Sequence, residues 1–80
     1  MDKEYKVLIN KALERFNFRL SMSGVAAEHA ARDSLTRAIR SLYDAAFYAD
    51  DLDALNELSE LVRDAECGVH IEPYALGNAA

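Results

Sequence analysis

The sequence predicts an all-α fold, a small three-helix up-down-up bundle with a short extended C-terminal tail. Apolar residues recur at helical spacing in three successive segments, and the 80 residues include only three glycines and one proline. Because the breaks between the segments are short, consecutive helices should be antiparallel neighbours. We therefore expect residues 1–68 to form the helical bundle and residues 69–80 to form an extended or disordered tail.

The first helix is expected over about residues 3–20. Its apolar side chains share one face at the 3.6-residue period, namely Tyr5, Ile9, Ala12, Leu13, Phe16 and Leu20. Phe18, Leu20 and Met22 also alternate with polar residues, which permits a short extended stretch before the break at residues 23–24. A helix followed by a turn is the favoured interpretation.

The second helix is expected over about residues 25–49. Eight alanines raise its helix propensity and allow neighbouring helices to approach closely. Three pairs of opposite charge at i,i+4 should support it from within: Glu28 with Arg32, Asp33 with Arg37, and Arg40 with Asp44.

The third helix should follow Asp50 and Asp51, which supply a candidate N-cap, and should run to about Glu66. Gly68 is a plausible residue to end it in a left-handed conformation. Pro73 then forbids a continued helix. The remaining segment is either an unstructured terminus or an extended arm.

Charge is unevenly distributed along this chain of net charge -5. Up to Arg19 there are five basic and three acidic residues, whereas residues 50–66 hold seven acids and Arg63 alone. Phosphate affinity comes mainly from clustered Lys and Arg, so direct nucleic-acid binding is not expected. A basic protein surface is the more natural complement.

One cysteine, Cys67, cannot form an internal disulfide, which fits a reducing, cytoplasmic setting. The N-terminal residues lack the pattern of a signal peptide, and no apolar run approaches the ~20 residues that span a bilayer. We expect a soluble protein without membrane contact.

The most informative pattern is a row of carboxylates in the third helix. They recur at i, i+4, i+7 and i+11, on one face: Asp53, Glu57, Glu60 and Asp64. Like charges at i,i+4 cost an isolated helix ~0.2–0.5 kcal/mol per pair, so local stability does not explain the row. It is either an anionic docking surface, or a face that is merely solvated or paired within the bundle with the basic row Lys11, Arg15 and Arg19.

These observations favour a non-enzymatic inhibitor or adaptor that docks the carboxylate row on a basic surface of a nucleic-acid-handling protein. In size and charge the chain resembles phage-encoded antagonists such as anti-CRISPR proteins, a resemblance that assigns no site. Glycine-rich nucleophile or phosphate loops are lacking, so neither an enzyme nor a bound cofactor is expected.

Surplus apolar residues suggest a different class, a homo-oligomeric helical bundle and possible homodimer. The candidate interface is Phe18, Met22, Tyr43, Phe47 and Tyr48. Alternatively, the tail folds back and covers these side chains with Val69, Ile71, Tyr74 and Leu76.

Two further interpretations carry less weight. A DNA-binding regulator could use Arg32, Arg37 and Arg40, although each arginine has an acidic neighbour at helical spacing. Cys67 and His70 have the spacing of a ligand pair, but a structural zinc site needs four ligands, so no metal is expected.

Overall fold

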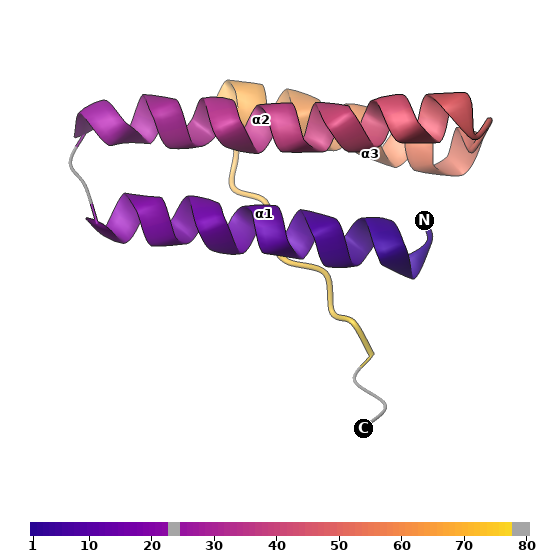
Figure 1. Ribbon diagram of the computed structural model, residues 1–80, viewed down its shortest axis with the longest axis horizontal. Coiled ribbons are helices and arrows are strands. Elements are labelled where there is room, and N and C mark those ends of the chain that lie inside the picture. Colours follow the sequence, from indigo (N-terminus) through magenta and orange to yellow (C-terminus); the bar gives the residue numbers. More distant parts are fainter. Residues whose placement is uncertain (23–24, 78–80) are drawn as a thin grey trace.

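Three helices make up the body of the protein in a computed structural model that describes residues 1–22 and 25–77. They are α1 (Lys3–Met22), α2 (Val25–Tyr48) and α3 (Leu52–Cys67), and each runs antiparallel to the one before it (Figure 1). The prediction of an all-α three-helix fold is confirmed, and the described residues contain no strand. The predicted break at residues 23–24 lies outside the described residues, but the last turn before it is helical rather than extended.

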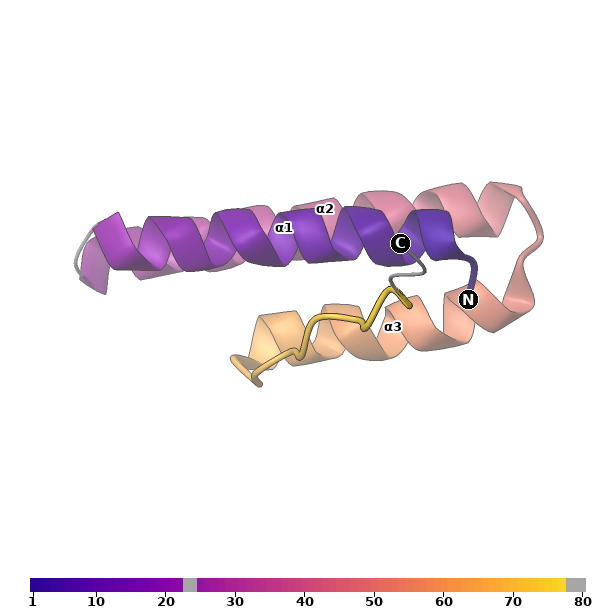
Figure 2. The same ribbon diagram turned by 90° about the horizontal axis from the view of Figure 1, so that it is seen from below.

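The central element is α2, because α1 and α3 both pack on it and not on one another. Among the described residues, no pair of Cα atoms from α1 and α3 lies within 8 Å. The tail after α3 turns back and runs along the space between these two helices (Figures 1 and 2). The architecture is thus a three-helix bundle whose open side is filled by an extended segment.

The core consists of one row of apolar side chains from each helix and one side chain from the tail. Its buried members are Ile9, Leu13, Leu35, Ile39, Ala46, Ala54, Leu58, Ala65 and Ile71. Ile9, Ile39 and Leu58 are the largest that are fully buried, and each comes from a different helix. The small alanine side chains let α2 and α3 approach closely, so the core is well packed although it has few large side chains.

Both ends of α3 carry the caps that the sequence predicts. The Asp51 carboxylate accepts a hydrogen bond from the backbone N–H of Ala54 at 3.2 Å, which satisfies a donor of the first turn. At the other end Gly68 adopts φ 75°, and the N–H of Val69 donates to the carbonyl of Asp64 at 2.9 Å. These caps fix where α3 begins and where the tail leaves it.

Two of the three predicted i,i+4 ion pairs on α2 are confirmed. Arg32 contacts Glu28 at 3.4 Å, and Arg37 contacts Asp33 at 3.0 Å. The third prediction, Arg40 with Asp44, is wrong because Arg40 instead pairs with Glu66 at the end of α3. Packing of α3 on α2 brings this carboxylate to the guanidinium and so replaces a local pair with a tertiary one.

The described part of the tail is an extended arm with specific contacts. Ile71 is only 8% exposed, and the Tyr74 side chain packs against the core.

None of the helices in the described residues is long and apolar enough to cross a membrane.

Candidate functional site

The four predicted carboxylates, called here the acidic face, lie along one flank of α3, where Asp53 contacts the Met1 amino group and Glu57 contacts the tail. Their surroundings differ along the helix. The Asp53 side chain is 82% exposed and that of Glu57 is 36% exposed. Glu60 is exposed and Asp64 is half-buried. The acidic face therefore forms one row along the helix, but its four carboxylates differ in their exposure to solvent.

Its N-terminal half is partly neutralised by the amino group of Met1. This nitrogen lies 3.0 Å from the Asp53 carboxylate and 4.0 Å from that of Glu57. The hydrogen bond to Asp53 raises the pKa of the Met1 amino group above its usual value. The positive charge thus reduces the negative potential at this half of the face.

Glu57 also holds the tail, since it accepts a hydrogen bond from the hydroxyl of Tyr74. Removal from water and this hydrogen bond to a carboxylate both raise the pKa of Tyr74 far above its usual range. The Lys6 ammonium lies 5.5 Å from the centre of the same ring, a cation–π contact. Glu57 is therefore part of an internal network rather than a free docking group.

The C-terminal half of the acidic face remains available. Among the described residues, neither Glu60 nor Asp64 forms an ion pair, and their carboxylates accept no hydrogen bond. Asp64 also lies in the last turn of α3, where the helix dipole disfavours negative charge. Local energetics therefore do not account for these two carboxylates.

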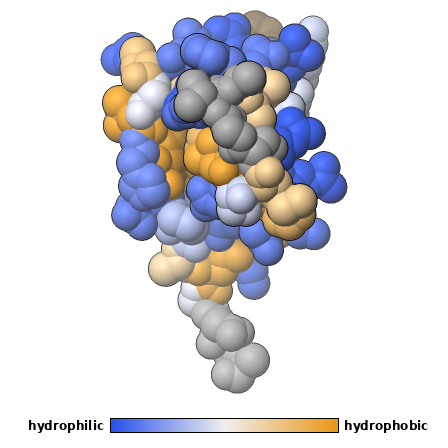
Figure 3. Space-filling view, turned by 90° about the vertical axis from the view of Figure 1, so that its left-hand side faces the viewer, coloured by the Kyte–Doolittle hydropathy of each residue, from blue (hydrophilic) through white to orange (hydrophobic). Residues whose placement is uncertain are grey.

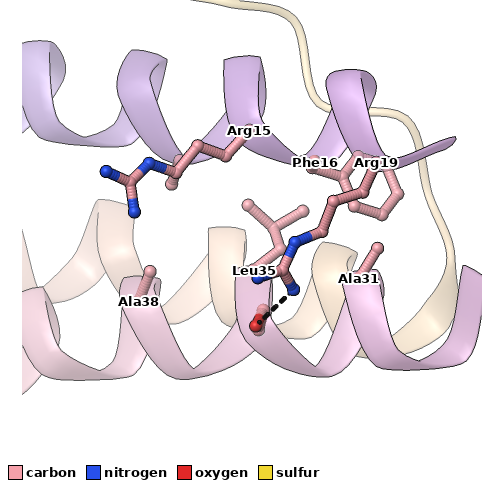
Figure 4. Close-up of a pocket in the computed structure, with 8 residues that line it drawn as sticks. Arg15, Phe16, Arg19, Ala31, Leu35 and Ala38 are labelled. Atoms are coloured by element: carbon pink, nitrogen blue, oxygen red, sulfur yellow. Dashed lines mark hydrogen bonds between the residues drawn. The ribbon is translucent and has the colours of Figure 1, made fainter. Parts of the chain in front are cut away.

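The basic row Lys11, Arg15 and Arg19 does not pair with the acidic face. Arg15 and Arg19 line the groove between α1 and α2, a hollow of about 130 Å³ (Figure 4). Arg19 reaches α2 and donates a hydrogen bond to the Ser34 hydroxyl at 3.0 Å, whereas the Arg15 side chain runs along the groove. Because the row lies on this side of α1 while the tail occupies the α3 side, opposite charges are segregated onto different faces.

The predicted oligomer interface is split between the two ends of the molecule. Phe18 and Met22 are 64% and 69% exposed near the end of α1, where the space-filling view shows apolar surface (Figure 3). Phe47 and Tyr48 are 59% and 85% exposed at the far end of α2, with their rings 5.7 Å apart. Tyr43 is half-buried against the core. These residues do not form one patch.

The folded-back tail does not cover the exposed aromatic side chains. Ile71 and Tyr74 pack between α1 and α3 instead, and Val69 is itself 52% exposed. The prediction that the tail folds back is confirmed. The prediction that it covers the surplus aromatic side chains is wrong, because the tail packs on the core instead.

Each of the three arginines proposed for DNA contacts a carboxylate in the described structure. Arg32 also lies 5.3 Å from the ring centre of Phe16. Each guanidinium would have to break its ion pair before it could bind a phosphate group. These ion pairs therefore disfavour nucleic-acid binding by this face of α2.

Cys67 is exposed, and His70 contacts Glu72 at 3.2 Å. Within the described residues there is no group of three or more side chains placed to hold a metal ion. Cys67 is the last residue of α3, and His70 lies in the tail that follows it.

Fold and charge together define a small all-α domain with an acidic α3 and a basic α1 on separate faces. The chain belongs to the family described as domain of unknown function (DUF4754), whose model matches residues 1–80. Comparison with curated proteins and with solved structures returned no match.

Proposed function

We propose that the protein is a non-enzymatic inhibitor or adaptor that docks its acidic face on a basic surface of a nucleic-acid-handling protein. The observation that carries this proposal is the pair Glu60 and Asp64, two carboxylates without an ion-pair partner among the described residues. They lie in a segment with seven acids and one arginine, residues 50–66. A basic partner would relieve the repulsion that the fold leaves in place.

The physics of such a face predicts a characteristic kinetic behaviour. Complementary charges steer encounter and raise the association rate, and salt screens this effect over about 8 Å at physiological ionic strength. Leu52, 72% exposed at the start of α3, and the aromatic pair Phe47 and Tyr48 at the end of α2 supply apolar contact area near the N-terminal end of the acidic face. Charge would set the approach and apolar burial would slow dissociation.

Capture from a host lysate tests the proposal, with wild type compared with the Glu60→Lys, Asp64→Lys double variant. These positions are chosen because Glu57 and Asp53 contact the tail or the Met1 amino group, so reversing them would also disturb the fold. The double variant should lose a partner that wild type retains at low salt and releases at moderate salt. Short duplex DNA should elute the same partner, because the docked surface is the one that binds nucleic acid.

A matched control makes the same change in net charge elsewhere. Glu4→Lys with Asp44→Lys alters exposed acids on α1 and α2, so it should leave capture intact. Equal loss of capture in both variants would show that capture depends on the net charge and not on the acidic face. Retention by the Glu60→Lys, Asp64→Lys variant would contradict the proposal.

A further inference from the structure

The exposed flank of α1 beside its groove with α2 combines positive charge with apolar surface. Lys11, Arg15 and Arg19 recur at i, i+4 and i+8 and are exposed. Phe18 lies among them and lines an open hollow together with all three and with Glu14, the one acid there. Met22, 69% exposed, continues this surface by one turn. We call Lys11, Arg15, Phe18, Arg19 and Met22 the basic face.

Within one chain the basic face cannot meet the acidic face. Both α1 and α3 pack on α2, and the tail lies between them, held by Asn10 on α1 and Glu57 on α3. Among the described residues, none of the three cations of the basic face forms an ion pair with a carboxylate. The three cations and the C-terminal half of the acidic face, Glu60 and Asp64, are thus left without an ion-pair partner among the described residues, whereas Asp53 and Glu57 contact the Met1 amino group.

The two faces are opposite in charge and comparable in length. At a rise of 1.5 Å per residue, the three cations extend over about 12 Å of helix and the four acids over about 16 Å. Each face also has exposed apolar residues beside its charges, Phe18 and Met22 on α1 and Leu52 at the start of α3. An acidic helix with an exposed aliphatic side chain at one end complements the charge and the apolar surface of the basic face.

We propose that the basic face binds the acidic face of a second copy of this chain. The contact joins different surfaces on the two copies, so it is head-to-tail and builds an open chain or a ring rather than a two-fold dimer. Copies of net charge -5 repel one another in general. Attraction is therefore confined to the orientation that places α1 of one copy on α3 of the next, which makes the association directional.

This inference does not depend on the proposed function, although the two share Glu60 and Asp64. Self-association additionally requires the basic face, whereas docking on another protein does not. A copy whose acidic face is occupied by a neighbour is also unable to dock elsewhere, so self-association would compete with partner binding.

Sedimentation equilibrium over a concentration series tests the inference by charge reversal. Wild type should form species larger than a monomer at low salt, and these should dissociate as salt is added. Arg15→Glu with Arg19→Glu, and separately Glu60→Arg with Asp64→Arg, should each weaken association by about tenfold or more. An equimolar mixture of the two double variants should associate again, because each restores the charge that the other has reversed.

Circular dichroism of each variant checks that the helices are retained. Lys3→Glu with Arg37→Glu lowers the net charge as much as Arg15→Glu with Arg19→Glu does, and this control should associate like wild type. A monomeric wild type throughout the series, or a mixture that stays monomeric although both variants are helical, would overturn the inference. The Arg15→Glu, Arg19→Glu variant should still capture the lysate partner. Failure of self-association is thereby separated from failure of the proposed function.

Discussion

Asn10 binds both backbone groups of Tyr74, a residue 64 positions away in the chain. Its Nδ2 donates to the Tyr74 carbonyl at 2.9 Å, and its Oδ1 accepts from the Tyr74 N–H at 2.8 Å. One amide side chain thereby satisfies a donor and an acceptor of an extended segment, as a neighbouring strand would. This contact fixes the tail on α1, and the hydroxyl of the same tyrosine reaches Glu57 on α3.

Replacing Asn10 should release the tail while leaving the three helices in place. Asn10→Ala removes two partly buried hydrogen bonds, each with a net value of about 0.5–1.5 kcal/mol. Hydrogen exchange should show lost protection at the Tyr74 amide and retained protection in α2. Asn10→Asp keeps the acceptor but not the donor, so it should have an intermediate effect. Unchanged protection at Tyr74 in Asn10→Ala would refute this role.

The Tyr74 phenol should make stability fall at alkaline pH. Its pKa is raised in the folded protein by removal from water and by the Glu57 carboxylate, whereas in the unfolded chain it ionises near its usual value of about 10. The folded state binds the proton more tightly, so this stabilisation is complete below about pH 10 and is lost as the pH rises above it. Urea unfolding across this range should show a steeper alkaline loss for wild type than for Tyr74→Phe. Parallel pH profiles would refute the assignment.

The turn between α2 and α3 contains a site where glycine should stabilise the protein. Asp50 has φ 54°, a left-handed conformation that glycine adopts more readily than other residues. Asp50→Gly is expected to raise the free energy of unfolding by about 0.5–1 kcal/mol, as measured by chemical denaturation. Gly68→Ala is the converse control at φ 75°, and should destabilise by about 1 kcal/mol. Its new methyl group would meet only the Arg32 guanidinium at 3.7 Å, so the cost would come from the backbone.

Helical periodicity and capping chemistry predicted the fold because both are encoded locally. The apolar rows around Ile9, Ile39 and Leu58 and the caps at Asp51 and Gly68 can be read within a few turns of sequence. The position of the tail could not be predicted in this way, since it depends on contacts across more than sixty residues.

Charge pairing was predicted correctly only where the partners lie on one helix. Local spacing cannot show that Arg40 selects Glu66 over Asp44, because that choice follows from the packing of α3 on α2. Nor does spacing show that Glu57 is engaged by Tyr74 while Glu60 stays free of an ion pair in the described structure. The acidic face was visible in the sequence, and its division into an internal half and an available half emerged only from tertiary contacts.

Site-specific photo-crosslinking tests the central claim, that the acidic face of α3 contacts a basic, nucleic-acid-binding surface. A photoreactive residue at Asn56, exposed between Asp53 and Glu60, would be compared with one at Ser41, exposed on α2. The account predicts a crosslinked host protein from Asn56 but not from Ser41, with the yield reduced by salt and by duplex DNA. Equal crosslinking from both positions, or a yield that neither salt nor DNA lowers, would contradict it.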